Sequence, residues 1–144
     1  MRTIKFRGRD ERGCWHIGWL AETNDGTIYI AENDEGWTDD GFHNDDFSGW
    51  YKVLEKTIGQ FTGLVDKNNK EIYEGDIVRD SEGKISYVKW LVQRCGFVLV
   101  YEQCDKDITG SYGKIEHLEI TGNIHDNPEL LKLYTGANDI RIKL

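Results

Sequence analysis

The histidines and cysteines of this 144-residue chain are the residues best suited to metal binding or nucleophilic catalysis. They are His16, His43, His117 and His125, with Cys14, Cys95 and Cys104. Cys14 and His16 stand two apart, which places both on one face of a strand, but structural zinc takes four ligands and no second pair lies nearby. An odd number of cysteines without Cys-x-x-Cys spacing indicates neither a disulfide framework nor a zinc knuckle. We therefore expect no metal.

Two further pairs resemble acid–base groups but are better explained as chain corners. His125-Asp126 directly precedes the start of an expected helix. Glu74 and Asp76 flank Gly75 at the entry to a strand, where their side chains should diverge and Asp76 should accept a backbone N–H. The sequence therefore predicts no catalytic residues and no enzyme, although a small enzyme of unrecognised type stays as an alternative.

Sequence motifs for nucleotides and calcium are also missing. Neither G-x-G-x-x-G nor G-x-x-x-x-G-K-[ST] occurs, so dinucleotide and Walker-type binding are not supported. Asp39-Asp40-Gly41 and Asn44-Asp45-Asp46 offer oxygen ligands, but they lack the spacing with which an EF-hand loop surrounds one ion. We expect no cofactor.

The net charge of −8 is unevenly distributed along the chain. Residues 13–51 contain no Lys or Arg and nine acids, namely Glu22, Asp25, Glu32, Asp34, Glu35, Asp39, Asp40, Asp45 and Asp46. Residues 1–12, by contrast, carry five bases and two acids. Because affinity for phosphate backbones comes from Lys and Arg, the acidic region excludes such binding through its own surface. We do not expect direct nucleic-acid binding.

Alternating apolar and polar residues predict short strands separated by Gly-containing turns. Thr3–Arg9 and Cys14–Leu20 are the first two expected strands, and similar segments follow to about residue 121. Asn68-Asn69 suits the two positive-φ positions of a type I′ hairpin, and Gly75 supplies the free φ of a second corner. Such strands predict a mainly β fold with a small barrel.

A single short helix is expected near the end of the chain. Asn127 fits the N-cap and Pro128 the first helical position, while Glu129 meets the positive end of the helix dipole. Gly136 is placed to end the helix after about two turns.

The acidic loop 31–50 is the candidate binding segment, because its periodicity fails and long irregular loops are often functional. Its candidate binding residues combine aromatic groups with carboxylates, and they are Trp37, Asp39, Asp40, Phe42, Asp45, Asp46 and Trp50. Charge of this kind accelerates encounter with a basic protein, while aromatic side chains supply affinity. The alternative is a solvated loop that the aromatic residues pin to the core.

Several blocks of the chain resemble the YopX family, small proteins of phages and prophages. They are IKFRG (Ile4–Gly8), GQFTGLVDKNNKEIYEGDIV (Gly59–Val78), VKW (Val88–Trp90), GFVL (Gly96–Leu99) and EITGNIHDNPELL (Glu119–Leu131). Gly8 stands where Ala is more usual, Asn69 stands where Gly is common, and residues 25–49 match nothing in the family. The resemblance implies a mostly β fold with an SH3-like barrel element and a phage or prophage origin, without an activity that can be transferred.

These observations predict one YopX-like domain over residues 1–144. It should contain an N-terminal β part at 1–57, an SH3-like small barrel at 58–125, and a short helix with a tail at 126–144. We expect an accessory protein of the host-cell cytoplasm, with no membrane span, that binds a basic host or phage protein without catalysis. An acidic DNA-mimic inhibitor of a nucleic-acid-binding host protein is the alternative, and self-association is left open.

Overall fold

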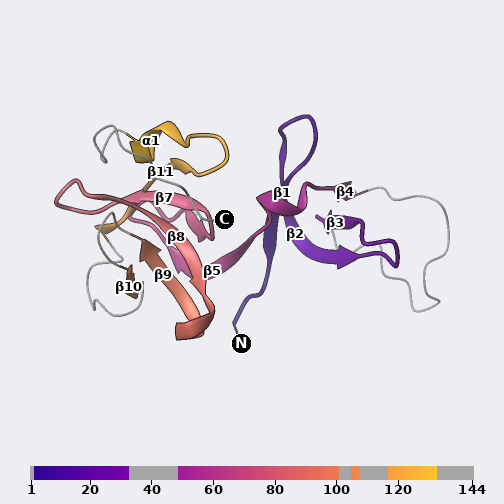
Figure 1. Ribbon diagram of the computed structural model, residues 1–144, viewed down its shortest axis with the longest axis horizontal. Helices are drawn as coiled ribbons and strands as arrows, with labels where there is room; N and C mark the ends of the chain where they lie inside the picture. The colour runs from indigo at the N-terminus through magenta and orange to yellow at the C-terminus, as the bar shows by residue number, and fades with distance from the viewer. Residues whose placement is uncertain (1, 33–48, 101–104, 108–116, 133–144) are drawn as a thin grey trace. The chain divides into compact units, whose positions relative to one another are not determined.

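The computed structural model describes residues 2–32, 49–100, 105–107 and 117–132, which fall into two compact units, Met1–Phe61 and Thr62–Leu144 (Figure 1). The first unit contains β1 (Phe6–Arg9), β2 (Trp15–Glu22), β3 (Ile28–Ala31), β4 (Trp50–Lys52), the 3-10 turn η2 (Glu55–Thr57) and the start of β5 (Gly59–Val65). The second contains the end of β5, then β6 (Glu71–Tyr73), β7 (Asp76–Arg79), β8 (Ile85–Leu91), η3 (Val92–Arg94), β9 (Gly96–Val100), β10 (Asp105–Asp107), β11 (Glu119–Asn123) and α1 (Glu129–Lys132).

The strands of the first unit form an antiparallel sheet in the order β4-β3-β2-β1-β5. Its core lies on one face, where Ile30 is fully buried and Val53 is 5% exposed. A Cβ atom on Gly8 would lie 2.9 Å from the Val53 side chain. Residue 8 is therefore glycine because β1 packs directly against Val53.

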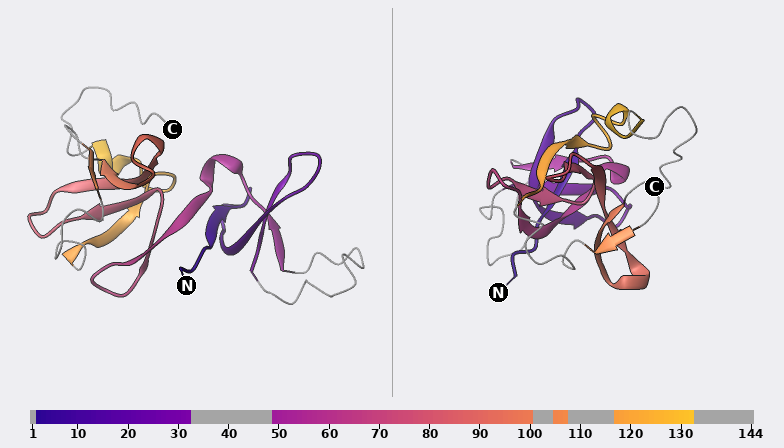
Figure 2. Two further views of the ribbon diagram at one scale, coloured as in Figure 1. Left: turned by 90° about the horizontal axis from the view of Figure 1, so that it is seen from below. Right: turned by 90° about the vertical axis from the view of Figure 1, so that its left-hand side faces the viewer.

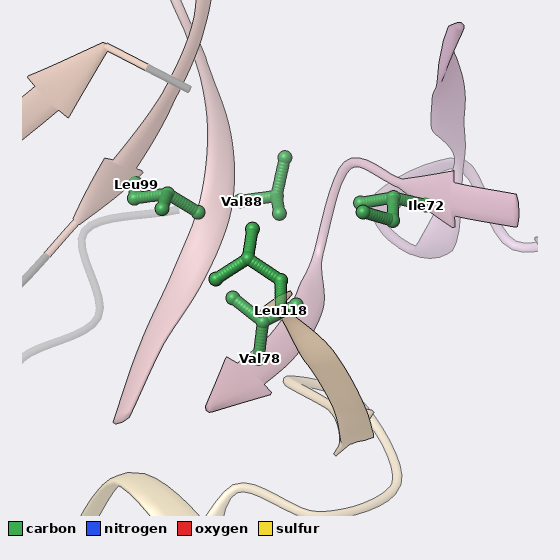
Figure 3. Close-up of a cluster of buried hydrophobic side chains, with 5 residues drawn as sticks. All are labelled: Ile72, Val78, Val88, Leu99 and Leu118. Carbon is green, nitrogen blue, oxygen red and sulfur yellow. The ribbon is translucent and has the colours of Figure 1, made fainter. Parts of the chain in front are cut away.

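The second unit is built on a sheet in the order β10-β9-β8-β7-β11, and β6 pairs with β5. Val78 and Val88 are at most 1% exposed on one face of the central strands β7 to β9, and Ile77 and Val98, which the strand register places on the other face, are 0% exposed. The core cluster contains Ile72, Val78, Val88, Leu99 and Leu118. Figure 3 shows these side chains gathered from β6, β7, β8, β9 and the residue before β11.

One type of five-residue turn joins several of the antiparallel strands, and Figure 2 shows the hairpins in two further views. In Asp66–Lys70 the N–H of Asn69 donates to the Asp66 carbonyl, the N–H of Asp66 donates to the Lys70 carbonyl, and Asn69 has a φ of 61°. Residues 10–14, 23–27 and 80–84 form the same pair of backbone bonds, with Gly13, Gly26 and Gly83 at the positive-φ position. This is a type I turn followed by a left-handed residue. The type I′ prediction was wrong, because only Asn69 of the two asparagines is left-handed.

Asp66 has a structural role beyond its turn. Its Oδ1 accepts the N–H groups of Asn68 (2.8 Å) and Lys70 (2.9 Å), while Oδ2 accepts the N–H of Ile120 (3.1 Å). Asp66 is 3% exposed, and the N–H of Lys67 also donates to the Leu118 carbonyl at 2.8 Å. The turn between β5 and β6 is thereby joined to the start of β11.

Gly75 and Asp76 form the second corner as the sequence predicts. Gly75 has a φ of 89°, and its N–H donates to the Val88 carbonyl at 2.8 Å. Asp76 is 1% exposed and accepts the Tyr73 N–H at 2.7 Å. The corner before β7 is therefore hydrogen-bonded to β8.

The mainly β class and the short C-terminal helix are confirmed. The described strands form two antiparallel sheets and no closed barrel, because β10 and β11 remain at opposite edges of their sheet. In α1 the N–H of Leu130 donates to the Asn127 carbonyl at 3.1 Å, so Asn127 does precede the first turn. The predicted end at Gly136 lies outside the described residues.

Replacing Gly75 by Ala should lower the free energy of unfolding by about 1 kcal/mol or more, because an L-residue is disfavoured in the left-handed region. Gly96→Ala is the matched control, since its Cβ would meet only the Arg94 carbonyl oxygen at 3.7 Å. Urea unfolding of both variants measures the difference. Equal destabilisation by the two substitutions would contradict the assigned role of Gly75.

Asp66→Ala should destabilise the protein by roughly 3 kcal/mol, because it removes the acceptor of three backbone N–H groups at a buried position. Asp80→Ala is a close control: the Asp80 Oδ1 accepts the N–H groups of Glu82 and Lys84, both at 2.9 Å, without a long-range bond. We expect a loss of only about 1 kcal/mol there. Comparable losses in thermal unfolding would show that the bond to Ile120 contributes nothing.

Candidate functional site

The predicted binding segment is anchored by the pairing of β3 with β4. Ala31 pairs with Trp50, and the N–H of Glu32 donates to the Gly49 carbonyl at 3.0 Å. Ala31, where the loop was expected to begin, belongs to β3, and Trp50, the last residue of the candidate segment, begins β4. Trp50 is half-buried. The other predicted binding residues, which are Trp37, Asp39, Asp40, Phe42, Asp45 and Asp46, lie outside the described residues.

His16 is held between two carboxylates beside this pairing, in an arrangement that we call the His16 clamp (Asp10, His16, Glu32 and Tyr51). Its Nε2 lies 3.0 Å from the Asp10 Oδ2, and its Nδ1 lies 2.9 Å from the Glu32 Oε1. The Tyr51 ring stacks on the imidazole with centroids 3.8 Å apart. The clamp connects the β1–β2 turn, β2, β4 and the residue that follows β3.

The charges around His16 favour its protonated form. Burial lowers the pKa of His16, but the hydrogen bonds to Asp10 and Glu32 and their charges outweigh burial, so the pKa lies above its ordinary value of 6.5. The hydrogen bond to His16, with backbone N–H donors from Cys14 and Arg12, holds the pKa of Asp10 below 3.8. Only an imidazolium can donate to both carboxylates at once.

A shallow pocket of about 310 Å³ adjoins the clamp, and its lining residues come from the β1–β2 turn and from β4. They are Asp10, Glu11, Arg12, Trp50, Tyr51 and Lys52. The lining therefore contains two acidic side chains, two basic side chains and two aromatic rings. No group of three or more His, Cys, Asp or Glu in the described residues is arranged to hold a metal ion.

The face of the first sheet opposite Ile30 and Val53 carries cations and aromatic rings, and it is partly covered, because Ala31 is 1% exposed and the Nε atoms of Arg7 and Arg9 are buried. Directly paired residues of antiparallel strands share a face, and alternate residues point the same way. The pairs Arg9–Trp15, Arg7–Ile17, Trp19–Ala31, Ala31–Trp50 and Tyr29–Lys52 therefore lie on one side. We call it the cation–aromatic face, and its charged and aromatic residues are Lys5, Arg7, Arg9, Trp15, Trp19, Tyr29, Trp50, Lys52 and Phe61.

Two contacts support this assignment of the face. The Arg7 guanidinium lies 4.9 Å from the centroid of the Trp15 ring, and the Lys5 ammonium lies 5.0 Å from that of Phe61. Ile17 and Trp19 are 46% and 55% exposed. No Asp or Glu occupies a described position of this face.

The residue pairs that resembled acid–base groups are not assembled into one site. The Asn123 Oδ1 accepts the N–H groups of His125 (3.0 Å) and Asp126 (2.9 Å), which makes this pair part of a turn. Cys14 is exposed whereas His16 is buried, so they do not share an environment. Sequence reasoning missed Glu32 and Asp10 as partners of His16, since no motif marks them.

A family model described as "YopX protein" matches residues 5–132. The chain belongs to the YopX family. The match extends from β1 through α1, so the YopX resemblance inferred from the sequence blocks is confirmed. Both units described above are therefore parts of one YopX chain.

One solved structure similar to this YopX chain is the crystal structure of protein EF1440 from Enterococcus faecalis. The TM-score is 0.52 and the sequence identity 24%, and the match covers 91% of this chain and 99% of the other. At this identity the likeness shows the fold alone. A comparison with curated proteins found no match. In the described part of this YopX chain, no helix has the length and apolar character that crossing a bilayer requires.

The clamp predicts that the protein loses stability as the pH rises. Because the pKa of His16 is raised in the folded state, its stabilisation is fully present below the unfolded value of about 6.5 and is lost as the pH passes the folded value. Urea-unfolding midpoints across this range should fall for the wild type and not for His16→Gln. Parallel pH profiles for the two proteins would contradict the clamp.

Proposed function

We propose that the protein is a phage- or prophage-encoded accessory protein that binds a basic protein partner without catalysing a reaction. The N-terminal unit is the binding unit, and the acidic segment between β3 and β4 makes the primary contact. The observation that carries this proposal is the pairing of Glu32 with Gly49, which fixes both ends of that segment at one point of the sheet.

Because of this pairing, both ends of the acidic segment have a defined place on the sheet. Binding residues are often found on loops whose ends are fixed by a rigid scaffold. Here the scaffold is reinforced on both sides: Tyr29, Ile30 and Ala31 of β3 pair with β4, and the His16 clamp holds the Glu32 carboxylate. The chain therefore enters and leaves the segment at neighbouring residues of the sheet.

The composition of the segment determines the chemistry of the partner. Its carboxylates have no Lys or Arg among them, so they would attract a partner that carries exposed basic residues. The interleaved aromatic residues would supply most of the affinity, as they commonly do at protein interfaces. Trp50 and the pocket beside it lie next to the anchor and extend this surface onto the sheet.

The test is to replace Asp39, Asp40, Asp45 and Asp46 with Asn and to recover partners from infected cells at low and high salt. We expect the wild type to capture a basic protein at low salt, less of it at high salt because exposed charges are screened, and the variant to capture little at either. A DNA-binding protein that duplex DNA displaces would favour the DNA-mimic alternative.

A matched control removes carboxylates from elsewhere in the chain. Glu55, Glu82 and Glu129 are exposed, and their replacement by Gln should leave recovery unchanged. Circular dichroism checks that each variant is folded. Unchanged recovery by the folded four-residue variant at both salt concentrations would refute the proposal.

A further inference from the structure

The His16 imidazole contacts residues on both sides of the point where β3 ends and β4 begins. Its Nδ1 lies 2.9 Å from the Oε1 of Glu32, the residue that follows β3, and the Tyr51 ring of β4 stacks on it with an interplanar angle of 11°. Next to this point, the Glu32 N–H donates to the Gly49 carbonyl at 3.0 Å. One side chain from β2 therefore holds both strands at this end of their pairing.

The two carboxylates that contact His16 are held to different degrees. The Oδ1 of Asp10 accepts the N–H groups of Arg12 and Cys14, both at 2.9 Å, so the turn fixes this carboxylate. Among the described residues, the Glu32 carboxylate has no hydrogen bond except that to His16. The Glu32 side chain is also 36% exposed, against 19% for Asp10. Glu32 is therefore the partner that can turn toward water.

The protonation state of the imidazole decides how many carboxylates it can bind. An imidazolium donates from both ring nitrogens, whereas a neutral ring donates from one and has a lone pair on the other. When Nδ1 gives its proton to solvent, its lone pair faces the Glu32 carboxylate and repels it, while Nε2 keeps its proton and its bond to Asp10. Loss of the positive charge also removes the attraction of a cation to the face of the Tyr51 ring.

The charges that act on His16 are those of Asp10 and Glu32. Other titratable side chains on the surrounding elements are solvent-exposed or lie on the opposite face of the sheet. The exposed ones are Glu11, Arg12, Cys14, Glu22 and Lys52, and those on the opposite face are Arg7, Arg9 and Tyr29. The state of the clamp therefore follows the proton on His16.

We propose that the His16 clamp is a pH-sensitive switch that closes the β3–β4 end of the first sheet when His16 is protonated. With the imidazolium, Glu32 is held and its N–H stays paired with Gly49. With the neutral ring, Glu32 turns toward solvent and this end of the pairing opens more often. The change occurs above pH 6.5, because the two carboxylates raise the pKa of His16. The switch is a property of the sheet and does not depend on the protein partner proposed above.

The experiment is amide hydrogen exchange, measured by NMR on the full chain from about pH 5 upward through the titration of His16, with each rate divided by its intrinsic value. Protection of the Glu32 N–H should be constant below about pH 6.5 and then fall by up to about tenfold per pH unit until His16 is neutral, because the open form binds fewer protons. The Thr23 N–H, which donates to the Thr27 carbonyl at the other end of the β2–β3 hairpin, should show no such step.

Variants identify the groups that set the step. Glu32→Gln keeps an acceptor for Nδ1 but removes one charge, so the step should move to lower pH by roughly 1 unit. Glu22→Gln, which removes an exposed carboxylate of β2, is the matched control and should leave the step in place. His16→Gln should abolish the step. The amide spectrum checks that each variant is folded.

Constant protection of the Glu32 N–H through the titration of wild-type His16 would overturn the proposal. An equal loss of protection at Thr23 would also overturn it, because the whole unit would then be opening rather than one end of a strand pair. Equal shifts of the step in Glu32→Gln and Glu22→Gln would contradict the assigned role of Glu32.

Discussion

An aspartate that begins a hairpin turn divides its two carboxylate oxygens between local and tertiary bonds, and both units depend on this division. In Asp66 and Asp10, Oδ1 accepts the N–H groups two and four residues later. The Oδ2 of Asp66 then accepts the Ile120 N–H, and that of Asp10 contacts His16. The carboxylate whose Oδ1 fixes the turn therefore also fixes, through its Oδ2, where a second strand or a side chain lies. Asp80 forms the local bonds in an exposed turn.

This division explains how short strands can make stable units. The strands of the second unit are three to seven residues long, so each strand pair has few ladder bonds, and register is set by the buried side chains together with the turns. Each turn sets the register of its hairpin, and the bond from Asp66 to β11 adds a contact between residues 54 apart in sequence. The core cluster around Val88 forms where these constraints meet.

In the first unit, the acidic and the basic residues are concentrated in different parts of the chain. Acids are concentrated between β3 and β4, whereas the cations of β1 lie on a sheet face with aromatic neighbours from β2 and β4. The excess of bases in the first residues is visible in the sequence. Its consequence is not visible there, because only strand pairing brings Arg7 beside Ile17 and Arg9 beside Trp15.

The sequence by itself determined the strand-rich class, the family, the Gly75 corner and the start of the helix, because these depend on periodicity and on backbone freedom at single residues. Tertiary structure alone decided that His16 lies between Asp10 and Glu32, and that the described strands form open sheets. Such outcomes depend on which strand edges pair and which buried polar groups find partners. Those are contacts between residues far apart in the chain, and no local pattern encodes them.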